Sequence, residues 1–441
     1  MNHFYKTIQE LKNFLILWAT QAFSSLGSSM TNFALVIWSY QEKGSALTTA
    51  LLSVCSYAPY VVMSIFAGAF TDRWNKKWMM LISDSVAALC TVAILILLSA
   101  GRLEIWHLYC LNALNGLMNT IQQPAADVTI SLLTPKKHYQ KVSGLRSFSN
   151  SLVSILTPVL ATALLSFTSI QAVIYFDLFT FAAAFLSLLF LVKIPEAPKG
   201  GAPEESIWTS AKGGLRYLRE HRGVLDLILF LAAINLTASI YNAAFPAMLL
   251  SRDGGGETAL GIVNTVTGLA MLTGSLIASA LPAPKSRVRV ICNTLLISMS
   301  TENFILAFGR SVPVWCLGAI LGWINIPVMN ANMDVLFRSY IPVSMQGRVY
   351  AARNTLQFFT IPVGYFLGGI LVDQVFEPFM ANQRPGRILT ALFGTGKGSG
   401  AALLFLLLGF LGMFTCLIFR KDRRIWGLEE KRGGEGGVSK I

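Results

Sequence analysis

Long runs of apolar residues, each bounded by a short polar stretch, recur along the chain. Each run holds roughly 20 to 28 residues, and a helix of about 20 apolar residues crosses the hydrocarbon core of a bilayer with its backbone groups paired internally. The alternating ten-residue segments of a membrane β-barrel are absent from the sequence. The pattern therefore predicts an all-α integral membrane protein with twelve transmembrane helices. Their expected ranges are 13–40, 46–70, 78–100, 105–130, 142–167, 171–192, 224–250, 258–281, 288–309, 312–335, 346–372 and 400–419.

Two stretches of the sequence allow more than one interpretation. The segment 373–399 contains a moderately apolar piece, 386–393, which we expect to be a surface helix or a re-entrant segment. The first apolar run is long and lacks a small-residue cleavage site, so we expect it to be the first span and not a cleaved signal.

Composition supports a membrane protein and narrows the possible functions. Only 13% of the 441 residues are charged and 54% are hydrophobic, whereas soluble domains carry about 25% charged residues. The net charge of +13 could suggest nucleic-acid binding, but no nucleic-acid-reading module fits between the spans. The six cysteines all lie inside apolar runs and form no CxxC pair, so they predict neither disulfides nor a metal site.

The distribution of Lys and Arg predicts the orientation. With the N-terminus inside, 28 of the 35 basic residues fall in cytoplasmic segments and 7 fall in outer segments. Because basic residues collect on the cytoplasmic side of membrane proteins, both termini are expected to be cytoplasmic.

The chain is expected to divide at its middle loop. Residues 193–223 hold several Pro and Gly residues followed by a basic, amphipathic stretch, which fits either a helix on the inner membrane surface or a simple linker. This loop separates an N-terminal six-helix bundle, 1–192, from a C-terminal six-helix bundle with a cytoplasmic tail, 224–441.

The two halves resemble each other in sequence. A constant offset of 204 relates three residues near the fifth span to three near the eleventh, and similar offsets relate prolines and glycines of other spans. The matched pairs are Asn150 and Asn354, Leu152 and Leu356, Pro158 and Pro362, Pro124 and Pro327, and Gly68 and Gly274. Since six spans per half is an even number, both halves enter the membrane in the same direction, as in carriers built from parallel repeats.

The loop after the second span carries the sharpest motif. Gly68 is followed by Asp72 and Arg73 and then by Lys76 and Lys77. A glycine allows close helix packing, and an acid in a tight turn can cap a neighbouring helix N-terminus, where the helix dipole is positive. The simpler interpretation is a basic inner loop that serves orientation alone, but orientation requires neither the glycine nor the acid.

This motif resembles the G-x-x-x-D-R-x-x-[KR]-[KR] motif of the major facilitator superfamily at every defining position. Within that superfamily, the chain looks most like the macrolide-efflux type of drug:proton antiporters. The shared features are the segment 13–27, the pattern from Pro124 to Pro135, Asp177 in the sixth span, and the turn 347–349.

The resemblance implies a cytoplasmic latch. Asp72 would hold the N-terminus of the eleventh helix in one conformation and release it in the other. Arg73 would pair with an acid at the inner end of the fourth helix, where Asp127 stands.

The chain also departs from the antiporter pattern in two places. In the fifth span, Thr157 precedes Pro158, with Ala161 and Thr162 after it, where antiporters have glycines. In the fourth span, residues 112–116 lack the intramembrane arginine of many antiporters. Antiport and any particular proton route are therefore less firmly implied than the fold.

Polar side chains form stripes on the first, fourth, seventh and tenth spans. Spacings of three, four and seven place most of them on one helix face. Amides in hydrocarbon are costly, so they should face a cavity or bond between helices. We favour a substrate cavity, because the resemblance implies that these four spans line one. The proposed cavity residues are Gln21, Asn32, Asn115, Asn119, Gln122, Asn235, Asn242 and Asn325.

Three acids lie within spans and could exchange protons: Asp84, Asp177 and Glu302. The resemblance, however, places the third, sixth and ninth spans at the periphery, so these acids could equally be hydrogen-bonded structural groups. The proton carrier stays open.

The sequence contains neither a GxxxxGK[ST] loop nor a HExxH or GxSxG motif, so no enzymatic activity, metal or cofactor is expected. We expect a monomeric secondary transporter in a bacterial plasma membrane that exports amphipathic drugs or similar small organic compounds by proton antiport and alternating access. A carrier for a natural solute, such as a siderophore, a peptide product or a lysolipid, is the alternative. A membrane enzyme or a receptor would need a catalytic cluster or a large outer domain, and neither is evident.

Overall fold

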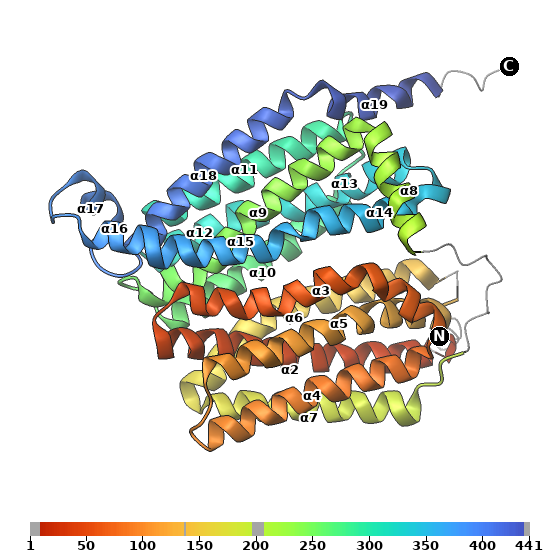
Figure 1. The fold of residues 1–441 in the computed structure, drawn as a ribbon, viewed down its shortest axis with the longest axis horizontal. Coiled ribbons are helices and arrows are strands. Elements are labelled where there is room, and N and C mark those ends of the chain that lie inside the picture. The colour runs from red at the N-terminus through yellow and green to blue at the C-terminus, as the bar shows by residue number, and fades with distance from the viewer. Residues whose placement is uncertain (1–8, 136–137, 196–206, 436–441) are drawn as a thin grey trace. The chain divides into compact units, whose positions relative to one another are not determined.

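The computed structural model describes residues 9–135, 138–195 and 207–435, and every element in these ranges is a helix (Figure 1). The side chains of some residues within helices are outside the description. These are residues 64–73, 139–140, 207–212, 338, 343–344, 346–348, 351 and 430–435.

The helices of the first half match the predicted spans to within a few residues. Because each predicted run ends at polar or turn-forming residues, the pattern located the helix ends closely. The elements are α2 (Lys12–Lys43), α3 (Ala46–Arg73), α4 (Lys76–Ser99), α5 (Ile105–Leu133), α6 (Tyr139–Phe167), α7 (Ile170–Leu186) and the π-helical turn η2 (Ser187–Leu191).

The second half contains more and shorter helices than its six predicted spans. The elements are α8 (Ile207–Glu220), α9 (Arg222–Ser251), α10 (Glu257–Ala280), α11 (Arg287–Phe308), α12 (Val312–Trp323), α13 (Ile326–Tyr340), α14 (Val343–Phe358), α15 (Thr360–Ile370), η3 (Leu371–Phe376), α16 (Glu377–Ala381), α17 (Ile388–Phe393), α18 (Ser399–Arg420) and α19 (Arg423–Glu435).

The tenth and eleventh spans are interrupted. The tenth breaks between α12 and α13, just before Pro327, and the eleventh breaks at Phe359, three residues before Pro362. Proline removes a backbone donor and disfavours helical geometry in the residue before it, so helices commonly break there. The matching prolines of the first half, Pro124 and Pro158, lie inside continuous helices. The two halves of the chain thus share their proline positions but not the helix interruptions near them.

Ten helical segments in the described residues are long and apolar enough to cross a membrane. The two further long helices, α2 with 32 residues and α5 with 29, are not among these ten. Both are longer than the roughly 20 residues that a span needs, but both carry the polar stripes noted above. With them, the twelve predicted spans are accounted for.

The chain divides into two compact units. The first comprises Met1–Glu42 and Cys55–Glu204, and the second comprises Lys43–Val54 and Glu205–Ile441. The helix α3 therefore begins in the second unit and continues into the first.

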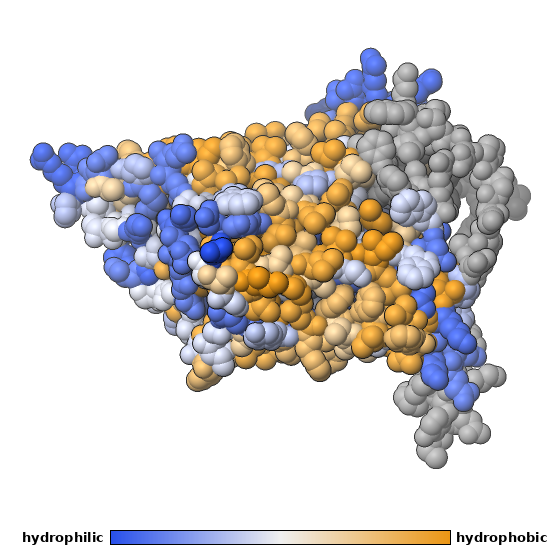
Figure 2. All heavy atoms as spheres, turned by 60° about the horizontal axis from the view of Figure 1, so that its bottom comes forward, coloured by the Kyte–Doolittle hydropathy of each residue, from blue (hydrophilic) through white to orange (hydrophobic). Residues whose placement is uncertain are grey.

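Each unit has its own apolar core, and large apolar side chains also lie on the surface. In the first unit, α4 packs against α5 and α7, and in the second, α11 packs against α18. Leu89, Phe167 and Phe179 are 67%, 87% and 73% exposed. The face in Figure 2 is largely hydrophobic across its middle and hydrophilic toward its ends. Such a surface is expected where lipid replaces water as solvent.

The stretch 373–399 is ordered by hydrogen bonds. Within it, α17 is the short helix expected near residues 386–393. The buried Arg252 donates to the carbonyl oxygen of Phe393 over 3.3 Å, and Arg310 donates to the carbonyl oxygen of Leu392 over 3.2 Å. Burial lowers the pKa of Arg252 to about 10, so the guanidinium stays charged at neutral pH. The two arginines thereby satisfy carbonyl groups at the end of α17.

Candidate functional site

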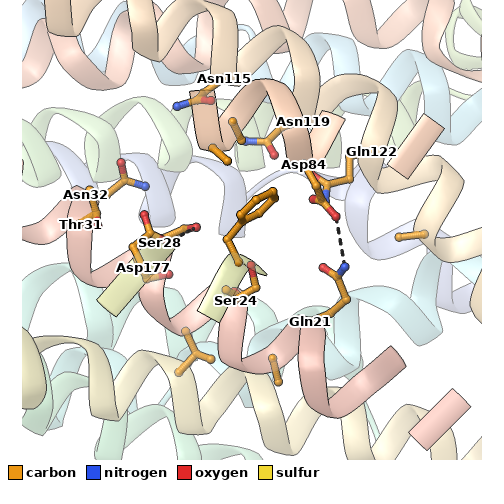
Figure 3. Close-up of a pocket in the computed structure, with 18 of the residues that line it drawn as sticks. Gln21, Ser24, Ser28, Thr31, Asn32, Asp84, Asn115, Asn119, Gln122 and Asp177 are labelled. Carbon is orange, nitrogen blue, oxygen red and sulfur yellow. Dashed lines mark hydrogen bonds between the residues drawn. The ribbon is translucent and has the colours of Figure 1, made fainter. Parts of the chain in front are cut away.

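A cavity of about 520 Å³ lies within the first unit (Figure 3). Its walls come mainly from α2, α4, α5, α6 and α7. The structure brings five of the predicted cavity residues to this wall: Gln21, Asn32, Asn115, Asn119 and Gln122. They share it with apolar side chains such as Leu17, Trp18, Met80 and Phe181.

Small residues allow the polar helices to pack closely beside the cavity. At Gly116 in α5, a Cβ atom would lie 2.0 Å from the carbonyl oxygen of Ser56 in α3. At Gly27 in α2, a Cβ atom would lie 2.8 Å from the Cα atom of Asp177 in α7. Since neither position has room for a side chain, the backbones approach closely, as in other membrane helix pairs. The polar stripes of α2 and α5 are fixed in place by these contacts.

Asp84 of α4 bridges the two polar stripes. Its Oδ2 atom accepts a hydrogen bond of 3.3 Å from the side-chain amide of Gln21 in α2, and its Oδ1 atom accepts one from that of Gln122 in α5. The side chain is partly exposed and belongs to the cavity wall (Figure 3). From sequence alone Asp84 fits a peripheral, structural role equally well, because no periodicity on α4 indicates that it reaches the cavity.

Asp177 of α7 is more enclosed. Its Oδ1 atom accepts a hydrogen bond of 3.0 Å from the hydroxyl of Ser28, and the residue is 4% exposed. Among the described residues of the cavity wall, Arg146 is the one cationic side chain, and its Nη2 atom lies 2.6 Å from Oδ1 of Asp127. The side chains that donate hydrogen bonds to Asp84 and Asp177, namely Gln21, Gln122 and Ser28, are neutral.

Glu302 of α11 lies in the second unit and is 4% exposed. Its Oε1 atom accepts hydrogen bonds of 2.6 Å from the Tyr241 hydroxyl and 2.8 Å from the Trp323 indole. Gly322 packs against it so closely that a Cβ atom there would lie 2.2 Å from Oε2. This enclosure suits a structural carboxyl group.

The other three predicted cavity residues belong to the second unit, and none lines the cavity described above. Asn235 donates to the carbonyl oxygen of Gln357 over 3.4 Å, and Asn325 donates to that of Leu321 over 2.8 Å. Asn242 is partly buried on α9. Backbone hydrogen bonding thus accounts for two of these three amides.

The predicted latch can be described in part. The side chains of Gly68, Asp72 and Arg73 lie outside the described residues, although α3 runs through these positions. Asp127, the predicted partner of Arg73, forms its ion pair with Arg146 of α6, and both side chains are about half exposed.

The lysines of the motif begin the next helix. Lys76 is the first residue of α4, and the side chain of Asn75 caps this helix. The Nζ atom of Lys77 donates to the carbonyl oxygens of Leu189 and Val192 over 2.9 and 3.0 Å. Lys77 therefore joins the start of α4 to the end of η2, where a positive charge is favourable.

Comparison with known proteins decides the family. The sequence profile of the Major Facilitator Superfamily matches residues 17–239, more than half of the chain. The chain belongs to the major facilitator superfamily. Since members of this superfamily are transporters, the chain is a multi-pass membrane transporter and not an enzyme.

Similar members of the superfamily include named exporters. Macrolide efflux protein A of Streptococcus pyogenes is 22% identical over 82% of this chain and 90% of its own length. The multidrug efflux pump Tap of Mycolicibacterium fortuitum is 24% identical over 81% of this chain and 88% of its own length. The enterobactin exporter EntS of Citrobacter koseri is 21% identical over 64% and 66% of the two chains.

The fold is that of other superfamily members. The crystal structure of a point mutant of the nucleoside transporter NupG aligns with a TM-score of 0.71 at 17% identity, covering 93% of this chain and all of that one. At this identity the likeness shows the fold alone, and the fold class predicted from sequence is confirmed.

Proposed function

We propose that this superfamily member exports amphipathic drugs or similar small organic compounds in exchange for protons, by alternating access. The observation that carries the proposal is the cavity of the first unit, with the partly exposed carboxyl group of Asp84 in its wall. Its volume of about 520 Å³ lies within the range of small-molecule sites. Its mixed apolar and amide-bearing wall suits compounds that have both characters.

Asp84 is the best candidate for the proton site among the three intramembrane acids. An ionised carboxyl group is costly in hydrocarbon unless a cation or a proton neutralises it. Asp84 is partly exposed and reaches the cavity, whereas Asp177 and Glu302 are each 4% exposed. Protonation would leave Asp84 able to accept fewer hydrogen bonds, so it would weaken the bridge to Gln21 and Gln122. A proton and a substrate could in this way compete for one wall of the cavity.

The comparisons support export without fixing the substrate. Two similar relatives are named as macrolide and multidrug exporters, and their identity to this chain is below 25%. The absence of the antiporter glycines around Pro158, where Thr157, Ala161 and Thr162 stand, and the missing fourth-span arginine still distinguish this chain from the antiporter pattern.

Transport in proteoliposomes tests the proposal. Purified protein is reconstituted, a pH gradient is imposed, and macrolides, dyes and lysolipids are screened for gradient-dependent accumulation. We expect accumulation with wild type and none above protein-free liposomes with Asp84→Asn, which should still exchange substrate down its own gradient. The matched control is Glu302→Gln, which changes a carboxyl group that does not line the cavity and should keep gradient dependence. Normal accumulation by Asp84→Asn would contradict the assignment.

A natural solute is the second candidate. The relative EntS is named as an exporter of enterobactin, a siderophore. Competition in the same assay separates the two proposals: unlabelled siderophores, peptides or lysolipids that displace every transported drug at lower concentration would favour the natural solute.

We further propose that the carrier works as a monomer in the bacterial plasma membrane with both termini in the cytoplasm. The division of basic residues, 28 inside and 7 outside, supports this orientation.

A further inference from the structure

The N-terminus of α3 is held by a carboxyl group from a distant part of the second unit. Asp373 of η3 accepts a hydrogen bond of 2.6 Å from the Ser45 hydroxyl, one of 3.0 Å from the Ala46 amide and one of 2.8 Å from the Leu47 amide. We call this set of contacts the Asp373 clasp. About 330 residues of sequence separate Asp373 from the start of α3. The carboxyl group accepts from backbone amides that α3 cannot pair internally, because they lie in its first turn.

The backbone brings the two sides together closely. Gly369, one helical turn before Asp373, packs against Leu47, and a Cβ atom there would lie 2.6 Å from the Cα atom of Leu47. The carboxylate then lies at the positive end of the α3 dipole, where a negative charge is stabilised. The clasp therefore combines tight backbone packing with a carboxylate placed at the N-terminus of a helix.

The clasp can open without leaving α3 uncapped. The Ser45 hydroxyl also accepts a hydrogen bond of 3.1 Å from the Thr48 amide, so α3 has a local cap of its own. If Asp373 withdraws, this cap remains, and water can satisfy the freed carboxylate and amides.

Four residues further along, Glu377 makes a similar contact that serves as a comparison. Its Oε1 atom accepts hydrogen bonds of 3.0 Å from the amides of Gly398 and Ala401 at the start of α18. Here both helices lie entirely within the second unit. In contrast, α3 leaves the second unit after Val54 and continues in the first. Asp373 thus holds the one end of a helix whose other end carries the Asp72 motif.

We propose that Asp373 is a positioning residue for transport: the clasp holds the N-terminus of α3 in one conformation of the carrier and releases it in the other. The inference rests on membership of the superfamily, whose transporters must change conformation, and not on drug or proton specificity. In this proposal the eleventh span supplies the carboxyl group that caps the second span. The role expected for Asp72 is the reverse, because there the acid of the second span holds the eleventh helix.

Two measurements on the full chain in lipid nanodiscs test the clasp, with neither substrate nor gradient. Hydrogen exchange reports whether the amides near residues 46 and 47 are freed. Labelling by a membrane-impermeant thiol reagent reports access to the cavity, using Asn115→Cys after Cys55, Cys110 and Cys316 are replaced by serine. Asp373→Asn should raise both exchange and the labelling rate by about tenfold, as expected for loss of a hydrogen bond to a charged group.

The control is Glu377→Gln, which should raise exchange near residues 398–401 and leave the labelling rate at its wild-type value. Ser45→Ala removes one contact of the clasp together with the local cap on the Thr48 amide, but it leaves the Asp373 bonds to the Ala46 and Leu47 amides. It should therefore shift labelling in the same direction by less, which keeps the test valid if Asp373→Asn fails to fold. Raised exchange with unchanged labelling in Asp373→Asn would make the clasp a static cap and overturn the proposal. Equal labelling changes in the Asp373 and Glu377 variants would overturn it too, since general loosening would explain both. Failure of the drug-export proposal would appear only in the transport assay.

Discussion

Glu302 depends on two neutral donors in an enclosed site, and removing one should be measurable. Tyr241→Phe deletes the 2.6 Å hydrogen bond to Oε1 and leaves that of the Trp323 indole. We expect the free energy of unfolding to fall by about 1–3 kcal/mol, because a buried polar group loses a partner. Thermal unfolding in detergent measures this. Tyr175→Phe, at a position 59% exposed, is the control and should change little. An unchanged melting temperature in Tyr241→Phe would contradict the structural role of Glu302.

At the same scale, the sequence predicted which side chains are polar and intramembrane but not which of them meet. The amide stripes on α2 and α5 could be read from spacing, since one helix face repeats every three or four residues. Asp84 could not be placed, because its position depends on Gln21 and Gln122 arriving from two other helices. The carboxylate caps of Asp373 and Glu377 have the same origin: each joins segments that only the folded chain brings together.

At the scale of the helix, close packing of α5 on α3 should be sensitive to a single methyl group. In Gly116→Ala the new Cβ atom would lie 2.0 Å from the Ser56 carbonyl oxygen, so the backbones must separate. We expect a loss of about 1–3 kcal/mol in stability, as for other overpacked sites, seen as a lower melting temperature. Gly144→Ala in α6 is the matched control, because its Cβ atom would meet nothing within 4 Å. The control should be neutral or stabilising, since alanine favours a helix by about 0.5–1 kcal/mol over glycine. Equal effects would show that packing does not limit α5.

Helix positions were predictable for a simple reason: a span must be long, apolar and bounded by polar residues. Interruptions inside a span carry no such signal. Pro124 and Pro158 lie in continuous helices, yet the helices around Pro327 and Pro362 are broken. Gly274 packs against the break before Pro327, where a Cβ atom would lie 2.2 Å from the Ile324 carbonyl oxygen. The outcome thus depends on a neighbouring helix, which the local sequence does not reveal.

For the whole molecule, twelve spans require both termini on one side of the membrane. Tags at the two ends should both resist protease added to intact cells, because the basic segments are expected to face the cytoplasm. A tag inserted after Gln383, between α16 and α17, should be cleaved and serves as the positive control. Cleavage of just one terminal tag would imply an odd number of spans and contradict the predicted topology.

The two helices that supply most of the polar wall, α2 and α5, are also the two long helices that fall short of the apolar character of the other spans. During synthesis each must leave the translocon for lipid, and amide groups make that transfer unfavourable for an isolated helix. We therefore expect α2 and α5 to enter the bilayer only after they have associated with neighbouring helices such as α3 and α4. Substitutions that improve binding in the cavity by adding polar groups would slow biogenesis, so the yield of inserted protein limits how polar the cavity can become.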